Sequence, residues 1–167
     1  FGNVNSAAEH TMAILLSLCR NVTVANASLK SGEWKRAPFT GYELKGKTVG
    51  IIGLGKVGGR VALRCRAFEA NVLACDPFLD VAFAKEHGVR AVGLDELLRA
   101  SDVVSLHVPL NDSTRHMISR DSLPKMKDGA TLINTARGGL LDEEACAEAL
   151  RADKLRGLGL DAFEQEP

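Results

Sequence analysis

The chain has 167 residues, of which 46% are hydrophobic and 25% charged, so we expect one soluble globular domain. Its 21 Lys and Arg residues balance 21 Asp and Glu residues without any basic tract, which argues against nucleic-acid and anionic-membrane partners. The apolar run from Met12 to Leu16 is far shorter than the ~20 residues of a membrane-spanning helix, and no signal-peptide pattern is present. The cysteine spacings fit neither a metal site nor a disulfide framework, which predicts reduced thiols in a cytoplasmic protein without a metal: Cys19, Cys65, Cys75 and Cys146.

The predicted elements begin with one helix over residues 6–30, which starts at the capping box Ser6–Glu9 and ends at Gly32. A polar connection follows over residues 31–46. Strand and helix patterns then alternate, with strands at 48–52, 71–75, 89–92, 102–108, 130–134 and 157–160, and helices at 57–68, 79–87, 94–100, 119–127 and 142–151. Such alternation predicts right-handed crossovers, and therefore an α/β doubly wound parallel sheet of the Rossmann type with an N-terminal helix preceding it.

A glycine-rich loop follows the first predicted strand and opens a helix. It has the pattern G-x-G-x-x-G, with glycines at Gly53, Gly55 and Gly58, and such loops bind the pyrophosphate of a dinucleotide. Asp76 ends the next strand, where a carboxylate can accept hydrogen bonds from an adenosine ribose and would repel a 2′-phosphate. The glycine-rich loop and Asp76 together therefore favour NAD over NADP as the cofactor. Two alternatives remain open, a glycine-rich turn without a ligand and an S-adenosylmethionine methyltransferase.

Chemically distinctive residues also stand at the ends of the later predicted strands. Because ligands of doubly wound sheets bind outside the carboxyl ends of the strands, we expect these residues at one edge: His107, Val108, Pro109, Thr135, Ala136, Arg137 and Asp161. Arg137 can hold a carboxylate through two parallel hydrogen bonds, and the glycines after it leave room for a substrate. The alternative for Arg137 is an ordinary surface ion pair.

Long segments of the chain resemble the D-isomer-specific 2-hydroxyacid dehydrogenases. They include GKTVGIIGLGKVGGRVA, VVSLHVPLNDSTRHMI, LPKMKDGATLINTARGGLLDEEACAEAL and GLGLDAFEQEP. The segment GEWKRAPFTGYELKGKT is most similar to the D-3-phosphoglycerate dehydrogenases within that family. The resemblance implies an NAD-dependent oxidoreductase that moves hydride between NAD(H) and a 2-hydroxy or 2-oxo acid, with 3-phosphoglycerate, and hence serine biosynthesis, the expected choice.

The resemblance also implies a role for individual residues. Arg137 would bind the substrate carboxylate and carbonyl, Glu166 would pair with the catalytic histidine, and Asp161 would hold the nicotinamide carboxamide. The remaining cofactor contacts would come from the pyrophosphate loop, the ribose acid, the adenine side and two backbone positions: Lys56, Val57, Asp76, Val108, Pro109, Thr135 and Ala136.

The chain departs from the family pattern in one respect. The family histidine follows the glutamate, whereas the histidines present, His10, His87, His107 and His116, do not match it; His10 and His107 are expected to be structural. In the family the cofactor domain is inserted into a second domain built from both chain ends. We therefore expect residues 1–167 to be an NAD-binding fragment that turns over little or nothing by itself.

The sequence leaves other functions and the quaternary structure open. The alternatives to 3-phosphoglycerate oxidation are a glyoxylate/hydroxypyruvate reductase and an NAD-sensing, corepressor-like binding protein. The apolar stripe of the first helix and the connection around Trp34 could form a homodimer contact in the full-length protein, or the stripe could pack on its own domain.

Overall fold

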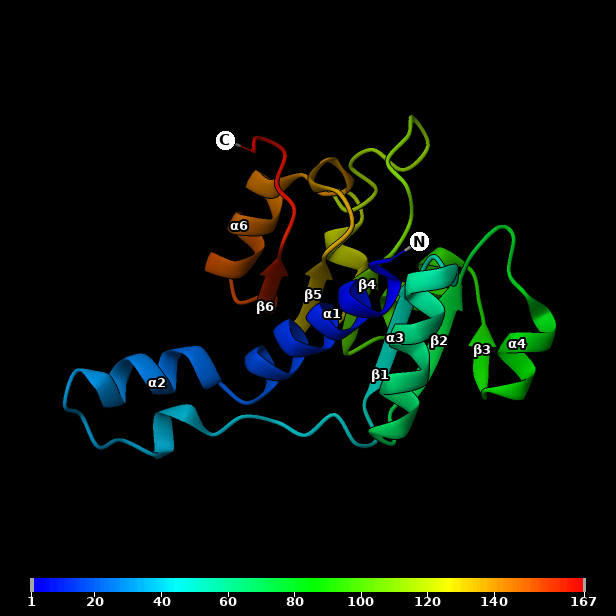
Figure 1. Cartoon of the computed structure of the whole chain (residues 1–167). Coiled ribbons are helices and arrows are strands. Elements are labelled where there is room, and N and C mark those ends of the chain that lie inside the picture. The colour runs from blue at the N-terminus through cyan, green and yellow to red at the C-terminus, as the bar shows by residue number, and fades with distance from the viewer. Residues whose placement is uncertain (1, 167) are drawn as a thin grey trace.

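The computed structural model describes residues 2–166 and contains a six-stranded parallel sheet with helices on both faces (Figure 1). The strand order is β3-β2-β1-β4-β5-β6, and the chain reverses direction across the sheet between β1 and β4. This confirms the predicted doubly wound fold. The strands are β1 (Thr48–Ile52), β2 (Asn71–Cys75), β3 (Val89–Ala91), β4 (Val103–Leu106), β5 (Ala130–Asn134) and β6 (Leu155–Leu160).

The central strands are buried on both faces, as is typical of parallel sheets. Every residue of β4 and β5 is buried, including the polar Ser105, Thr131 and Asn134. One hydrophobic cluster lies under α1 (Val4–Cys19), α3 (Lys56–Ala67) and α4 (Val81–Glu86). A second lies under α5 (Leu94–Ala100) and α6 (Glu143–Arg151).

The N-terminal region differs from the prediction of one helix over residues 6–30. It forms α1 and α2 (Val22–Lys30), which are bent by 62° relative to each other. Asn21 lies between them with a φ of 55°, a left-handed conformation that asparagine adopts more easily than most residues. The predicted capping box is also wrong, because α1 begins before Ser6 and Glu9 instead pairs with Arg64 at 3.1 Å.

The two N-terminal helices bury different amounts of surface. In α1 the side chains of Ala8, Met12, Leu15 and Cys19 are buried in the first cluster, so its apolar stripe packs on its own domain. In contrast, α2 has no buried residue and extends away from the body of the domain (Figure 1). No single helix among residues 2–166 could cross a membrane; only the bent pair α1 and α2 together has sufficient length and apolar composition.

Other predicted elements differ from the structure, most of them by one or two residues at an end: the helices expected at 57–68, 79–87 and 142–151 are Lys56–Ala67, Val81–Glu86 and Glu143–Arg151, and the strand expected at 89–92 is Val89–Ala91. The expected helix at 119–127 is a single 3₁₀ turn, Leu123–Lys125, because only four residues separate Pro124 from Gly129, whose φ of 73° ends the segment. The strand expected at 102–108 is limited to Val103–Leu106. Strand β6 begins at Leu155, two residues earlier than expected, where it pairs with Ala130.

Candidate functional site

The three glycines of the loop after β1 are required for three different reasons. Gly53 has a φ of 93°, which only glycine adopts without strain. A Cβ on Gly58 would lie 1.9 Å from the carbonyl oxygen of Gly53, so the third glycine allows α3 to approach the loop. At Gly55 a Cβ would meet nothing within 4 Å, which leaves the backbone open to a ligand. This arrangement fits the pyrophosphate of a dinucleotide.

The amino end of α3 strengthens that fit. Gly55 is the N-cap residue and provides no side chain to cap the helix, so the backbone N–H groups of the first turn are directed at the open space. Lys56 and Val57 are the first two residues of this turn. The helix dipole and these donors favour an anionic group, as expected if the loop binds the pyrophosphate of a dinucleotide.

Asp76 lies beside the glycine loop at the end of β2. Its Oδ2 accepts a hydrogen bond from the Leu54 N–H at 2.7 Å, and its Oδ1 accepts one from the Phe78 N–H at 2.8 Å. An ionised carboxylate offers about four acceptor positions, so two bonds leave capacity for the hydroxyls of a ribose. The structure thus brings the loop and the acid together.

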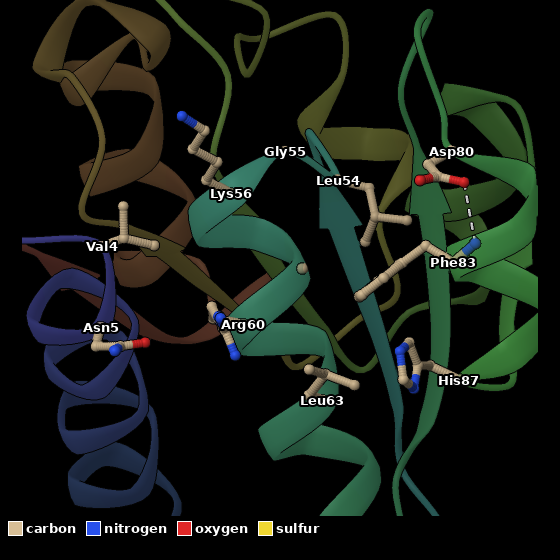
Figure 2. A pocket seen from close by; sticks show the side chains of 11 residues that line it. Val4, Asn5, Leu54, Gly55, Lys56, Arg60, Leu63, Asp80, Phe83 and His87 are labelled. Carbon is tan, nitrogen blue, oxygen red and sulfur yellow. Dashed lines mark hydrogen bonds between the residues drawn. The ribbon is translucent and has the colours of Figure 1, made fainter. Parts of the chain in front are cut away.

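A cavity of about 740 Å³ adjoins the loop on the side of α1 and α4 (Figure 2). Gly55 and Lys56 line it, but no other predicted site residue does. Phe83 reaches across it from α4 toward α3, whereas Lys56 points away from Phe83. The cavity therefore borders the predicted pyrophosphate position without containing the rest of the site.

The end of β4 contributes the segment His107–Pro109. A Cβ on Gly53 would lie 2.8 Å from Cγ1 of Val108, so this segment lies directly beside the glycine loop. The His107 Nε2 lies 2.8 Å from the Ser105 hydroxyl, and burial lowers the pKa of the imidazole to about 4. His107 is therefore neutral at pH 7 and has the structural environment that the sequence suggested.

Asn134 organises the end of β5, and sequence reasoning assigned it no role. Its fully buried side chain donates to the carbonyl oxygen of Arg137 at 2.8 Å and accepts from the N–H of Ala136 at 3.1 Å. These two bonds fix the turn that carries Arg137. The signal in the sequence was an asparagine at the end of a largely apolar strand.

Helix α1 contacts two of the predicted cofactor positions. The Thr11 and Thr135 hydroxyls lie 2.7 Å apart, and Thr11 is fully buried. The His10 Nε2 lies 3.1 Å from Oδ1 of Asp161, at a partly exposed position. The sequence predicted a structural role for His10 but did not identify this partner.

Arg137 and Glu166 line one cavity of about 390 Å³ beyond the ends of β5 and β6. The Arg137 guanidinium donates to the carbonyl oxygen of Ala136 at 2.6 Å. Within residues 2–166 no carboxylate forms an ion pair with Arg137, although Glu164 and Glu166 line the same cavity. An exposed guanidinium without a carboxylate partner can bind a carboxylate ligand.

Across the described residues no group of three or more His, Cys, Asp or Glu side chains could hold a metal ion.

The predicted residues thus fall into two groups along one edge of the sheet. The glycine loop, Asp76 and Val108 form one, and the turn with Arg137 forms the other, joined through β5 and β4. The classical strand order with a glycine loop at its first crossover defines a dinucleotide-binding domain.

Comparison with known proteins narrows this class. Residues 12–167 match the family model described as D-isomer specific 2-hydroxyacid dehydrogenase, NAD binding domain. The chain belongs to this family, and NAD is its cofactor. It is 48% identical over 166 residues to a D-3-phosphoglycerate dehydrogenase of Archaeoglobus fulgidus, covering 99% of this chain and 32% of the relative.

Two further relatives are named for other substrates. A hydroxypyruvate reductase of Thermotoga maritima is 46% identical over 162 residues, which cover 97% of this chain and 52% of that protein. The structure of a D-lactate dehydrogenase from Aquifex aeolicus, complexed with NAD and lactic acid, superposes with a TM-score of 0.91 at 42% identity, over 96% of this chain and 48% of the other. The chain therefore spans about a third to a half of the length of these relatives.

Proposed function

We propose that this chain is the cofactor domain of an enzyme that transfers hydride between NAD(H) and C2 of a D-2-hydroxy acid. The observation that carries the proposal is the cavity shared by Arg137 and Glu166, at the same sheet edge as the glycine loop. The relatives are longer than this chain, so the rest of the substrate cleft would come from a second domain.

The chemistry divides among residues of this chain. The N–H groups at Lys56 and Val57 would bind the pyrophosphate, and Asp76 would bind the adenosine ribose. Val108 and Pro109 would line the adenine side, Thr135 and Ala136 would contact the cofactor through their backbone, and Asp161 would hold the carboxamide. Bound NAD supplies the hydride acceptor or donor at its nicotinamide ring.

Arg137 would orient the substrate through its carboxylate and stabilise negative charge on the C2 oxygen. Glu166 would act on a histidine supplied by the second domain. A carboxylate beside an imidazole stabilises the protonated ring, and so assists transfer of the hydroxyl proton.

For the substrate we propose 3-phosphoglycerate, because several D-3-phosphoglycerate dehydrogenases are 45–48% identical to nearly the whole chain. Hydroxypyruvate is the second candidate, since the Thermotoga maritima reductase is 46% identical. A cytoplasmic location belongs to the same proposal and agrees with four free cysteines.

The full-length protein would be a homodimer in which α2 and the following connection contact a second copy. Val22, Val24 and Leu29 of α2 are each more than half exposed, and Trp34 is 74% exposed. Monomeric proteins rarely expose such a group of large apolar side chains on one projecting segment.

Calorimetric titration of this chain with NADH and NADPH tests the cofactor assignment, with tighter binding of NADH expected. The full-length protein should then reduce NAD with 3-phosphoglycerate as substrate, and this chain alone should show little turnover. Binding of NADH without turnover of any 2-hydroxy acid by the full-length protein would favour a cofactor-sensing protein instead.

A further inference from the structure

The segment that carries Glu166 lies outside the sheet. Asp161 donates its N–H to the carbonyl oxygen of Asn134 at 3.1 Å, and within the described chain no backbone-to-backbone hydrogen bond holds residues 162–166 after it. Phe163, Glu164 and Glu166 are exposed. Side-chain contacts must therefore determine where the Glu166 carboxylate lies.

One such contact joins the segment to a distant loop. The His116 Nε2 pairs with Oε1 of Glu164, across 48 residues of sequence. The Glu164 N–H also donates to Oε1 of Glu143 at the start of α6, at 2.6 Å. Glu164 is thus held from both sides, whereas Glu166 itself contributes only a long 3.4 Å contact with the Phe163 N–H.

His116 is itself rigidly placed. Its N–H donates to the carbonyl oxygen of Gly139 at 2.9 Å, and its φ of 49° is unusual for a residue other than glycine. Two residues later the fully buried Ile118 pairs with Leu141 in an isolated parallel bridge. The imidazole therefore projects from backbone that is fixed to the turn following Arg137.

The segment rests directly on that same turn. A Cβ on Gly138 would lie 1.9 Å from the carbonyl carbon of Phe163, so no side chain separates the two backbones. A shift at Glu164 would change the cavity shared by Arg137 and Glu166, which Glu164 also lines.

Charged groups surround this contact. Arg115 from the loop of His116 and Arg137 from the turn are the cations, and the carboxylates are Glu143 from α6 and Glu164 and Glu166 from the segment. A hydrogen bond from an imidazole to an ionised carboxylate is stronger than one between two neutral groups, so the pairing of His116 with Glu164 can hold the segment in place.

We propose that His116 is a positioning residue, which holds the segment carrying Glu166 against Gly138 through Glu164. Its effect on catalysis rests on the proposed function of Glu166, but its effect on the order of the segment does not. The order of residues 163–166 can therefore be measured on this chain without cofactor or substrate.

Amide ¹⁵N relaxation tests the proposal directly. We expect backbone order parameters for Phe163 and Glu164 near the ~0.85 of rigid backbone in the unmodified chain. In His116→Asn, which tolerates a positive φ but cannot form the ion pair, the values should be clearly lower. Glu164→Gln should reproduce this loss, and the double variant should add nothing to either single variant.

His87→Asn is the matched control, because His87 contacts Phe83 on α4, away from this segment, and it should follow the unmodified chain. Equal order parameters in His116→Asn and the unmodified chain would overturn the proposal. In the full-length protein His116→Asn should lower kcat several-fold with an unchanged Kd for NADH. A segment whose order depends on His116, in a protein without dehydrogenase activity, would overturn the proposed function alone.

Discussion

The Asp76 carboxylate accepts a hydrogen bond from the Leu54 N–H at 2.7 Å, and so connects the acid at the end of β2 to the glycine loop. One side chain therefore orders the loop and, in the proposed site, would also present negative charge to a ribose. Replacing the carboxylate by an amide tests the second role.

Asp76→Asn keeps one acceptor oxygen, which can still accept from the Leu54 N–H, but it loses the second acceptor, which accepts from the Phe78 N–H, and the charge that repels a 2′-phosphate. We expect NADH binding to weaken about tenfold, which corresponds to ~1.4 kcal/mol, and the preference for NADH over NADPH to narrow. Calorimetric titration with both cofactors measures the change. Asp142→Asn, at the N-cap of α6, is the control and should leave both affinities unchanged.

Adjacent glycines in α3 offer a matched pair. Gly58→Ala would place a Cβ 1.9 Å from the Gly53 carbonyl oxygen, so we expect lower thermal stability and loss of NADH binding. Gly59→Ala would meet only the Phe83 ring at 3.3 Å, and helix propensity should offset much of that contact, because alanine is favoured over glycine by ~1 kcal/mol. Thermal denaturation and NADH titration of both variants check this, and equal behaviour would contradict the assigned role of Gly58.

His107 should make stability depend on pH. Burial lowers its folded-state pKa to about 4, below the ~6.5 of an unfolded histidine, so the unfolded state binds the proton first as the pH falls. The contribution of neutral His107 to the free energy of unfolding is complete above pH ~6.5 and decreases toward pH 4, by up to about 3 kcal/mol. Urea denaturation measures the free energy of unfolding at pH 7 and at pH 4.5. The difference between the two values should be smaller for His107→Asn than for the unmodified chain, and identical differences would argue against a neutral, buried ring.

Arg137→Gln tests the substrate site in the full-length protein. It keeps a polar side chain but removes the bidentate charged contact, so kcat/KM should fall by ~10²-fold or more, and by far more than the affinity for NADH. Arg120→Gln removes an arginine that pairs with Glu148 at 2.7 Å on the surface, and should have little effect on either quantity. A normal kcat/KM in Arg137→Gln would exclude Arg137 from the reaction.

Local sequence patterns predicted the sheet well but predicted long-range contacts poorly. The strand at Ala130–Asn134 was predicted with correct bounds, because an apolar run between a turn and an arginine carries its own signal. The break at Asn21 was missed because helical periodicity continues across it, and only the backbone conformation of one residue differs. The pairing of His116 with Glu164 could not be predicted, since 48 residues separate them and the loop between carries no regular pattern.

Helix α1 gives the protein a mechanical connection between two distant regions. Around Thr11 it is fastened to the edge of the sheet that holds Thr135 and Asp161, and at Cys19 it leads through the bend at Asn21 into α2. The eight residue steps from Thr11 to Cys19 correspond to roughly 12 Å of helix, which packs on the core through Met12 and Leu15. If a second subunit bound α2 and displaced it, the displacement would therefore be transmitted through α1 to its contacts with Thr135 and Asp161, at the edge where the nicotinamide ring would lie.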